Sequence, residues 1–190
     1  MASESRDVDA EVPHSSRPSL AMWLAFVLMA AAILAVWLSR GVRPRLPDRP
    51  PLIGQIAPEI RVQGWINGPG PTPEELAGKI VVLDVWAYWC GPCRAAAPEL
   101  IALYNKYKER GVVFLGLTEE DSSALEQSRR FVAETKLTWP QGYGAGETIE
   151  ELEVHWIPQL FVIGPDGRIA WDLSSGEPIE QVLDRLTRSG

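Results

Sequence analysis

Residues 79–86 constrain the fold most, because they form an almost continuous apolar run, KIVVLDVW. A strand with one solvent-facing side alternates apolar and polar residues, whereas a strand buried on both faces is apolar throughout. A helical pattern follows over about 93–110, Gly111 ends it, and residues 112–117 repeat the pattern of a buried strand. This order predicts two parallel strands joined by a right-handed crossover.

The remaining residues from 54 onward predict further elements around this pair. Residues 59–65 indicate a short strand, and the sequence Thr72-Pro-Glu-Glu75 is typical of a capped helix start. Later in the chain we expect helices over 123–136, 147–152 and 178–188, and a hairpin formed by 159–163 and 168–172. Together these elements predict an α/β fold with a central mixed sheet flanked by helices.

Residues 20–38 are 19 consecutive residues without a charge, and most of them are apolar. As a helix they would be about 28 Å long, close to the thickness of a membrane's hydrocarbon core. Trp23 and Trp37 lie near the two ends, where indoles favour the headgroup level. The alternatives are a buried soluble helix and a cleaved signal peptide, but no small-x-small cleavage site follows Leu38. We expect an uncleaved transmembrane anchor.

The anchor divides the chain into four predicted parts. Residues 1–19 are rich in Ser, Pro and acidic residues, which is typical of a disordered tail. The anchor covers 20–38, and residues 39–53, which contain four prolines, predict an extended linker. Residues 54–190 form the predicted folded domain.

The charge of the chain argues against nucleic-acid binding. The formal net charge is −7, and residues 59–190 carry 12 Lys or Arg against 20 Asp or Glu. An acidic surface repels phosphate backbones.

The only two cysteines are spaced as Cys90-Gly91-Pro92-Cys93 at the predicted start of a helix. Residues one helical turn apart have Cα atoms about 5 Å from each other, which suits a disulfide that opens and closes without backbone movement. The helix N-terminus favours a thiolate on Cys90, so we expect Cys90 to be the nucleophile and the more buried Cys93 to react second.

Two other interpretations of the cysteine pair are a zinc site and a purely structural disulfide. A zinc site needs about four ligands, and only His14 and His155 could join the cysteines, with His14 beyond the predicted anchor. A purely structural disulfide closing so short a loop restrains little chain entropy. We therefore expect no metal and no other cofactor.

The segment DVWAYWCGPC, from Asp84 to Cys93, followed by Pro98, resembles the active-site segment of thioredoxins. The fuller pattern resembles their membrane-anchored TlpA/ResA/CcmG-like branch of thiol-disulfide oxidoreductases. That pattern comprises Gly54-x-x-Ala-Pro58, Leu76-x-Gly78-Lys79, and Ile157-Pro158 ahead of Gly164-x-Asp-Gly167. The resemblance spans residues 52–188 and implies a thioredoxin-like fold.

The resemblance assigns Asp84 as the buried carboxylate that exchanges a proton with Cys93. Independently, an Asp inside an apolar strand is costly to bury unless it has a partner or stays neutral. A raised carboxyl pKa would suit a proton acceptor for a thiol. The alternative is an Asp that is only hydrogen-bonded at the end of its strand.

The resemblance also implies roles near the cysteines. Pro158 matches a proline held in cis opposite them, and the backbone of Ile157 would pair with substrate as an added strand. Trp89 would form a contact surface, Gly91 and Pro92 belong to the active-site loop, and Trp86 is expected in the core.

Three departures from the branch concern the tuning of potential and substrate. Ala96 stands where ResA-like members often have Glu, residues 112–118 contain no Lys to face Asp84, and Gln159 replaces a common Thr or Ser. His155 is interpreted either as a modulator of the redox site or as a surface histidine.

These features predict a reductase of disulfides in client proteins. The Gly-Pro spacing is that of thioredoxin, whose potential is about −270 mV, against about −120 mV for strong oxidants. The resemblance implies a client such as apocytochrome c or its maturation factors, and a membrane electron donor. The alternatives are a disulfide oxidase or isomerase, a non-catalytic adaptor, and a peroxiredoxin, whose Pro-x-x-x-Thr/Ser-x-x-Cys pattern is missing before Cys90.

The location of the domain is predicted from two conflicting arguments. Four arginines within residues 39–53 follow the anchor and two precede it, which by the positive-inside rule places the domain in the cytoplasm. A tethered reductase has little purpose in a reducing cytosol, and the TlpA/ResA/CcmG-like branch is mostly extracytoplasmic. We therefore expect an extracytoplasmic or periplasmic domain.

Overall fold

The computed structural model describes residues 23–24, 26–32 and 52–188. The chain divides into two units, residues 1–49 and 50–190, which are considered separately. In the first unit the described residues are helical and exposed. No helix within the described part of the chain has the length and hydropathy needed to cross a membrane. The predicted tail, most of the predicted anchor over 20–38, and nearly all of the predicted linker lie outside the described residues.

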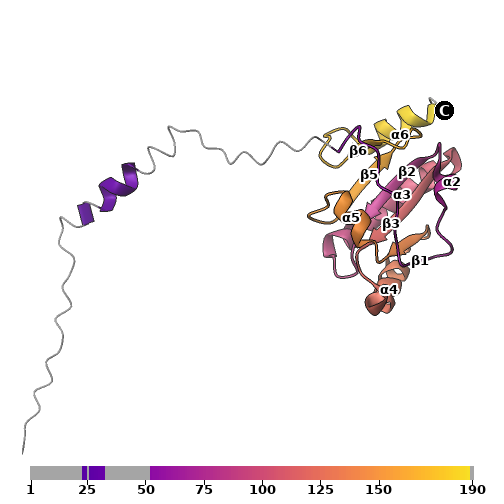
Figure 1. The fold of residues 1–190 in the computed structure, drawn as a ribbon, viewed down its shortest axis with the longest axis horizontal. Helices are drawn as coiled ribbons and strands as arrows, with labels where there is room; N and C mark the ends of the chain where they lie inside the picture. The colour runs from indigo at the N-terminus through magenta and orange to yellow at the C-terminus, as the bar shows by residue number, and fades with distance from the viewer. Residues whose placement is uncertain (1–22, 25, 33–51, 189–190) are drawn as a thin grey trace, which may run out of the picture. The chain divides into compact units, whose positions relative to one another are not determined.

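The second unit is built on a six-stranded mixed sheet with the strand order β1-β4-β3-β2-β5-β6 (Figure 1). The parallel pairs are β2 with β3 and β3 with β4, and the other neighbours are antiparallel. The strands are β1 (Gly64–Ile66), β2 (Ile80–Val85), β3 (Val112–Thr118), β4 (Gln141–Tyr143), β5 (Gln159–Ile163) and β6 (Ile169–Asp172). The predicted mixed sheet is confirmed.

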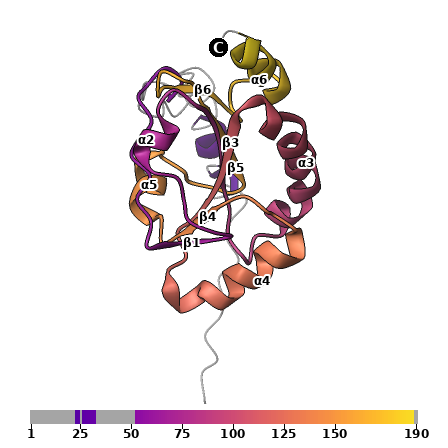
Figure 2. The same ribbon diagram turned by 90° about the vertical axis from the view of Figure 1, so that its right-hand side faces the viewer.

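Helices cover both faces of this sheet. The α-helices of this unit are α2 (Pro73–Leu76), α3 (Gly91–Tyr107), α4 (Leu125–Thr135), α5 (Gly146–Glu151) and α6 (Ile179–Arg188). Figure 2 looks along the sheet and shows α2 and α5 on one side, with α3 and α6 on the other. The arrangement is the predicted thioredoxin-like fold.

Strand β2 is buried on both faces of the sheet, which explains its apolar sequence. All six of its residues are buried. Ile80 and Val82 belong to the core cluster that includes residues of α3, α4 and α6, whereas Val81 belongs to the cluster that includes residues of α5. Successive side chains of a strand point to opposite faces, so Asp84 continues the series of Ile80 and Val82 and faces the α3 layer.

Local signals explain where several elements begin and end. Thr72 caps α2, with Glu75 N donating to Thr72 Oγ1 at 3.3 Å and Thr72 N donating to Glu75 Oε2 at 2.8 Å. After α3 a 3₁₀ turn, Lys108–Arg110, leads to Gly111, whose φ of 79° lies in the left-handed region that favours glycine. These boundaries follow the predictions closely.

Two strands differ from the predictions. The strand expected over 59–65 is wrong in extent, because β1 covers only Gly64–Ile66. The second difference is β4 (Gln141–Tyr143), which the sequence did not predict. Its three residues are too few to show the alternation of apolar and polar side chains that marks a strand. Its central residue is Gly142, where a Cβ would come within 2.6 Å of Val62 Cγ1, so the close packing there requires glycine. Pairing with β3 and β1 rather than local propensity therefore defines β4.

Candidate active site

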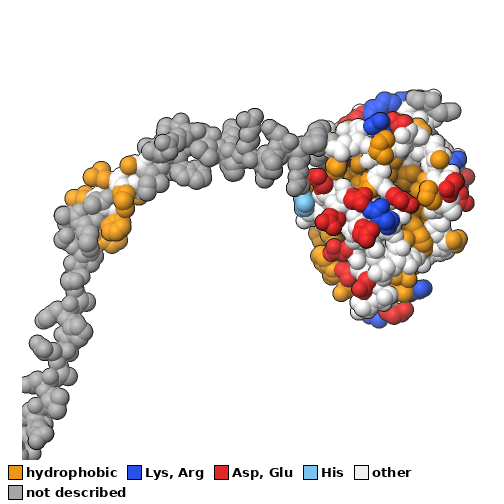
Figure 3. Space-filling view, in the orientation of Figure 1, with side chains coloured by type: hydrophobic (Ala, Val, Ile, Leu, Met, Phe, Trp, Pro, Cys, Tyr) orange, Lys and Arg blue, Asp and Glu red, His pale blue; other side chains and the backbone are white. Residues whose placement is uncertain are grey.

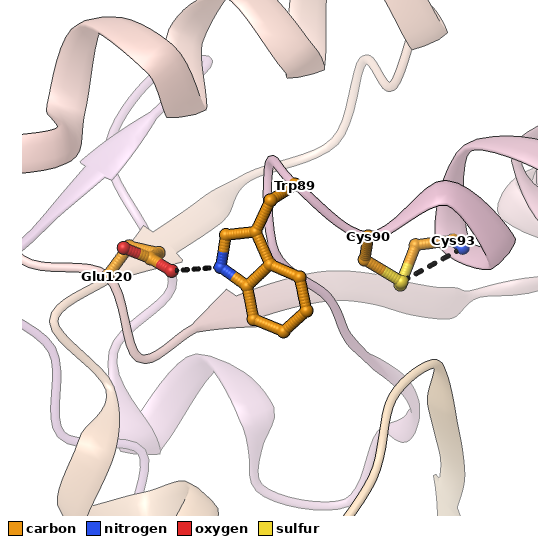
Figure 4. The surroundings of a disulfide bond; sticks show 4 residues. All are labelled: Trp89, Cys90, Cys93 and Glu120. Atoms are coloured by element: carbon orange, nitrogen blue, oxygen red, sulfur yellow. Dashed lines mark hydrogen bonds between the residues drawn. A yellow bond between two sulfur atoms is a disulfide. The ribbon is translucent and has the colours of Figure 1, made fainter.

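Cys90 and Cys93 form a disulfide at the N-terminus of α3, directly after β2 (Figure 4). Their Cα atoms are 5.3 Å apart, as the spacing predicted. Cys90 is the N-cap residue of α3, and Cys93 N donates a hydrogen bond to Cys90 Sγ at 3.0 Å. The unpaired N–H groups of a helix start stabilise negative charge. The site therefore favours a thiolate on Cys90 when the disulfide is reduced.

Both cysteines are buried in this disulfide form. Cys90 is 3% exposed and Cys93 is 6% exposed. The expectation that Cys93 is the more buried of the two is therefore wrong here. The sulfur of Cys90 is bonded to Cys93 and turned back onto the first turn of α3, which limits its own exposure. Any molecule that approaches the disulfide therefore contacts the residues around it first.

Trp89 is the exposed residue beside the disulfide. Its side chain is 60% exposed, and its Nε1 donates a hydrogen bond to Glu120 Oε1 at 2.7 Å (Figure 4). Sequence reasoning placed Trp89 correctly at the surface but missed Glu120. The carboxyl ends of parallel strands meet at one edge of a sheet. An acidic residue that follows β3, such as Glu120, could therefore have been expected near Trp89, which follows β2.

Asp84 lies on β2 and is 8% exposed. Burial raises the pKa of its carboxyl to about 7, because loss of hydration disfavours the charged form. Asp84 lies opposite Gly116 on β3 and Leu160 on β5, neither of which carries a charge. A raised pKa is the property that a proton acceptor for a thiol needs, and proton exchange between Asp84 and Cys93 stays a prediction.

Asp84 borders a cavity of about 410 Å³ on the α3 side of the sheet. Ala96 and Leu100 of α3 line it, together with Pro158 and Leu160. Ala96 is the position where ResA-like members often have Glu, and its small side chain leaves this space open.

The peptide bond between Ile157 and Pro158 is cis, as the resemblance implied. It precedes β5, whose Gln159 lies opposite Val85 at the carboxyl end of β2. Pro158 lines the cavity at Asp84, whereas Ile157 lines a second cavity that Trp89 also borders.

The other residues singled out from the sequence have distinct places. Gly91 and Pro92 are exposed at the start of α3. Trp86 is 1% exposed, stacks on Phe131 with ring centroids 4.7 Å apart, and donates from Nε1 to the side chain of Gln141, so its core assignment is confirmed. His155 is exposed and borders the second cavity.

Within residues 23–24, 26–32 and 52–188, no cluster of three His, Cys, Asp or Glu side chains could hold a metal ion.

The fold and the Cys90–Cys93 disulfide define a thioredoxin-fold protein with a dithiol-disulfide site. The chain belongs to the AhpC/TSA family, whose model matches residues 53–172. It is similar to the thiol-disulfide oxidoreductase ResA of Bacillus thuringiensis subsp. konkukian (strain 97-27). The identity is 30% over 137 residues, which are 72% of this chain and 78% of the relative.

Two solved structures support the fold. The thioredoxin domain of a thiol-disulfide oxidoreductase from Bacteroides vulgatus has a TM-score of 0.61 at 22% identity and covers 71% of this chain and 97% of its own. A thiol-disulfide isomerase from Corynebacterium glutamicum has a TM-score of 0.60 at 23% identity, with 69% and 96% covered. With the ResA relatives, the site identifies a ResA-like thiol-disulfide oxidoreductase that carries the Cys90–Cys93 pair.

Proposed function

We propose that this chain is a membrane-anchored reductase of disulfides in client proteins. The observation that carries this proposal is the Cys90–Cys93 disulfide at the N-terminus of α3, with the buried carboxyl of Asp84, whose pKa burial raises to about 7, facing the same layer. A group that titrates near neutral pH can accept a proton in one step and return it in the next. Resolution of a mixed disulfide requires such an acceptor for the second thiol.

In the proposed reaction the thiolate of Cys90 attacks one sulfur of the client's disulfide. A bond forms between Cys90 Sγ and that sulfur, and the client's other sulfur leaves as a thiolate that takes up a proton. Cys93 then passes its proton to the carboxylate of Asp84 and attacks Cys90 Sγ, which breaks the bond between Cys90 Sγ and the client's sulfur. That sulfur leaves as a thiolate and takes up a proton. The client leaves with two thiols, and the enzyme holds the Cys90–Cys93 disulfide, so two electrons have passed from enzyme to client.

The direction of the reaction is proposed from the residues between the cysteines. Gly91 and Pro92 are the pair found in thioredoxin, whose potential of about −270 mV makes it a reductant. The test is the reduction potential of the full chain in detergent micelles, equilibrated in glutathione or dithiothreitol buffers and followed by tryptophan fluorescence. A value at or below about −250 mV supports a reductase, whereas one above about −180 mV indicates an oxidase or isomerase.

The proposed clients are proteins such as apocytochrome c or its maturation factors, with a membrane protein as electron donor. Similarity to ResA and the TlpA/ResA/CcmG-like pattern supports this choice. A Cys93→Ser variant should trap clients as mixed disulfides on Cys90, and mass spectrometry would identify them. Full function of a variant that lacks both cysteines would favour a non-catalytic adaptor instead.

We further propose that residues 20–38 anchor the chain and that the domain is extracytoplasmic. The uncharged run supports the anchor, and the need for a reductase outside the reducing cytosol supports the location. The test is labelling of Cys90 in intact, reductant-treated cells with a membrane-impermeant maleimide. Labelling only after cell lysis would place the domain in the cytoplasm.

A further inference from the structure

A second cavity beside the disulfide has features that the proposed reaction does not use. Its volume is about 220 Å³, and three tryptophans border it: the buried Trp86 and the exposed Trp89 and Trp156. Trp89 and Trp156 are each 60% exposed. Its apolar lining comes from the end of β2, from α5 and from the segment before β5, namely Val85, Ala87, Ile149, Val154 and Ile157. We call it the tryptophan cavity.

The size and walls of the tryptophan cavity suit one side chain of a protein partner. Pockets for drug-sized ligands and cofactors are about 300–1,000 Å³, so this cavity is small for them. Exposed indoles are costly to leave in water and are typical anchors of protein interfaces. Two exposed indoles on one cavity, next to a disulfide that is itself buried, favour a large apolar side chain of the client as occupant.

The charge around the tryptophan cavity favours a particular charge on the client residue next to that apolar side chain. Glu119 and His155 are exposed and border the cavity, and Glu120 holds the indole of Trp89. Residues 117–128 and 141–157, which supply much of the lining, contain no Lys or Arg. Figure 3 shows acidic side chains among hydrophobic ones over the face that carries α5.

One arginine, Arg61, lies near the tryptophan cavity, but the charge around the cavity stays negative. Arg61 lines a neighbouring pocket that also includes Glu119. Its guanidinium is paired with both Glu147 and Glu151 of α5, so two acidic groups offset its charge. The tryptophan cavity therefore has an acidic rim and complements a cation.

We propose that the tryptophan cavity is a specificity site for the client. It binds a segment that carries a large apolar or aromatic side chain within a few residues of the attacked cysteine, with a Lys or Arg beside it that reaches Glu119. Trp156 and Glu119 determine this preference. The proposal rests on the proposed disulfide reductase and adds the chemistry of the segment it attacks.

The test uses the full chain in detergent micelles, reduced with dithiothreitol and freed of it. The substrates are short peptides whose single cysteine is disulfide-linked to thionitrobenzoate, with Phe or Ser at one neighbouring position and Lys or Glu at the next. Attack by Cys90 on the peptide sulfur releases coloured thionitrobenzoate. Ellman's reagent, which carries no peptide, reports the reaction without the cavity's occupant.

The expected result is a graded preference. The second-order rate constant should be about tenfold higher for Phe than for Ser, from burial of an apolar side chain. It should be roughly threefold higher for Lys than for Glu, as for an exposed charge pair. Trp156→Ala should remove the preference for Phe, and Glu119→Gln should remove the preference for Lys. Ile56→Ala and Glu109→Gln, exposed positions outside the cavity, should keep both preferences.

The outcomes separate this inference from the proposed function. If all peptides and Ellman's reagent react, but Phe and Ser peptides react equally, the specificity site is refuted and the reductase stands. The same holds if Trp156→Ala or Glu119→Gln retains the full preference of the unsubstituted protein. If neither the peptides nor Ellman's reagent is reduced, the proposed function itself fails.

Discussion

Replacing Asp84 with Asn tests the central electrostatic feature of the site. The substitution keeps the size of the side chain and removes the only ionisable group from β2 (Ile80–Val85). The carboxyl is 8% exposed, and burial raises its pKa from the usual 3.8 to about 7. In the unfolded chain the same carboxyl is hydrated and has its usual pKa.

The effect on stability follows from this difference. Between pH 3.8 and about 7 the folded protein holds a proton that the unfolded chain has lost, so the free energy of unfolding falls as the pH rises. Above about pH 7 both states are ionised and the full penalty applies. Because a tenfold change in the ionisation constant is worth about 1.4 kcal/mol, the penalty is at most about 4 kcal/mol. Asp84→Asn should therefore be more stable than the unsubstituted protein at pH 8 by up to that amount.

The assay is urea unfolding of the oxidised full chain in detergent micelles, followed by tryptophan fluorescence from pH 4 to pH 8. Other groups titrate in both proteins and cancel in the difference between them. We expect the advantage of Asp84→Asn to grow from near zero at pH 4 to its full value at pH 8. Asp172→Asn is the matched control, because that buried carboxylate accepts hydrogen bonds from Ser174 N and Ser174 Oγ at 2.8 and 2.6 Å.

The control substitution should not raise stability at pH 8, since the oxygen that accepts both hydrogen bonds from Ser174 would become a neutral amide oxygen, which is a weaker acceptor than a carboxylate oxygen. An Asp84→Asn protein that is no more stable at pH 8, or whose advantage does not change with pH, would refute the reasoning. It would mean that Asp84 is already ionised well below neutral pH in the folded protein. The assignment of Asp84 as the proton acceptor for Cys93 would then be lost as well.

Three further predictions follow from the site and the core. The rate at which Cys93 resolves a mixed disulfide should fall as the pH drops below about 7, because protonated Asp84 cannot accept a proton, and stopped-flow rates of Asp84→Asn should lose this inflection. Ala96→Glu places a second carboxyl in the cavity at Asp84, and repulsion between like charges should move the same inflection to higher pH. Gln141→Leu leaves the buried Trp86 Nε1 without its acceptor, which should lower the free energy of unfolding in urea by about 1–3 kcal/mol.

Much of the fold could be predicted because its signals are local. The unbroken apolar run identified β2 as a strand buried on both faces, and Thr72 and Gly111 marked helix boundaries through capping and backbone conformation. The same holds for the Cys90–Cys93 disulfide, since one helical turn sets the distance between the two residues. The anchor over residues 20–38 remains a prediction.

Other features depend on contacts between residues far apart in the chain. The hydrogen bond from Trp89 to Glu120 joins residues 31 positions apart, and β4 exists because it pairs with β3 and β1. The burial of Cys90 and the shared cavity of Trp89 and Trp156 also arise from packing.

The sequence by itself determined the class of fold, the position of the redox pair and the presence of an ionisable group in the core, because periodicity and spacing record them directly. Only the tertiary structure decided how strongly Asp84 is desolvated, what holds Trp89, and which side chains surround the disulfide. These properties depend on how the carboxyl ends of β2 and β3 and the segment before β5 come together. No local pattern along the chain reports that packing.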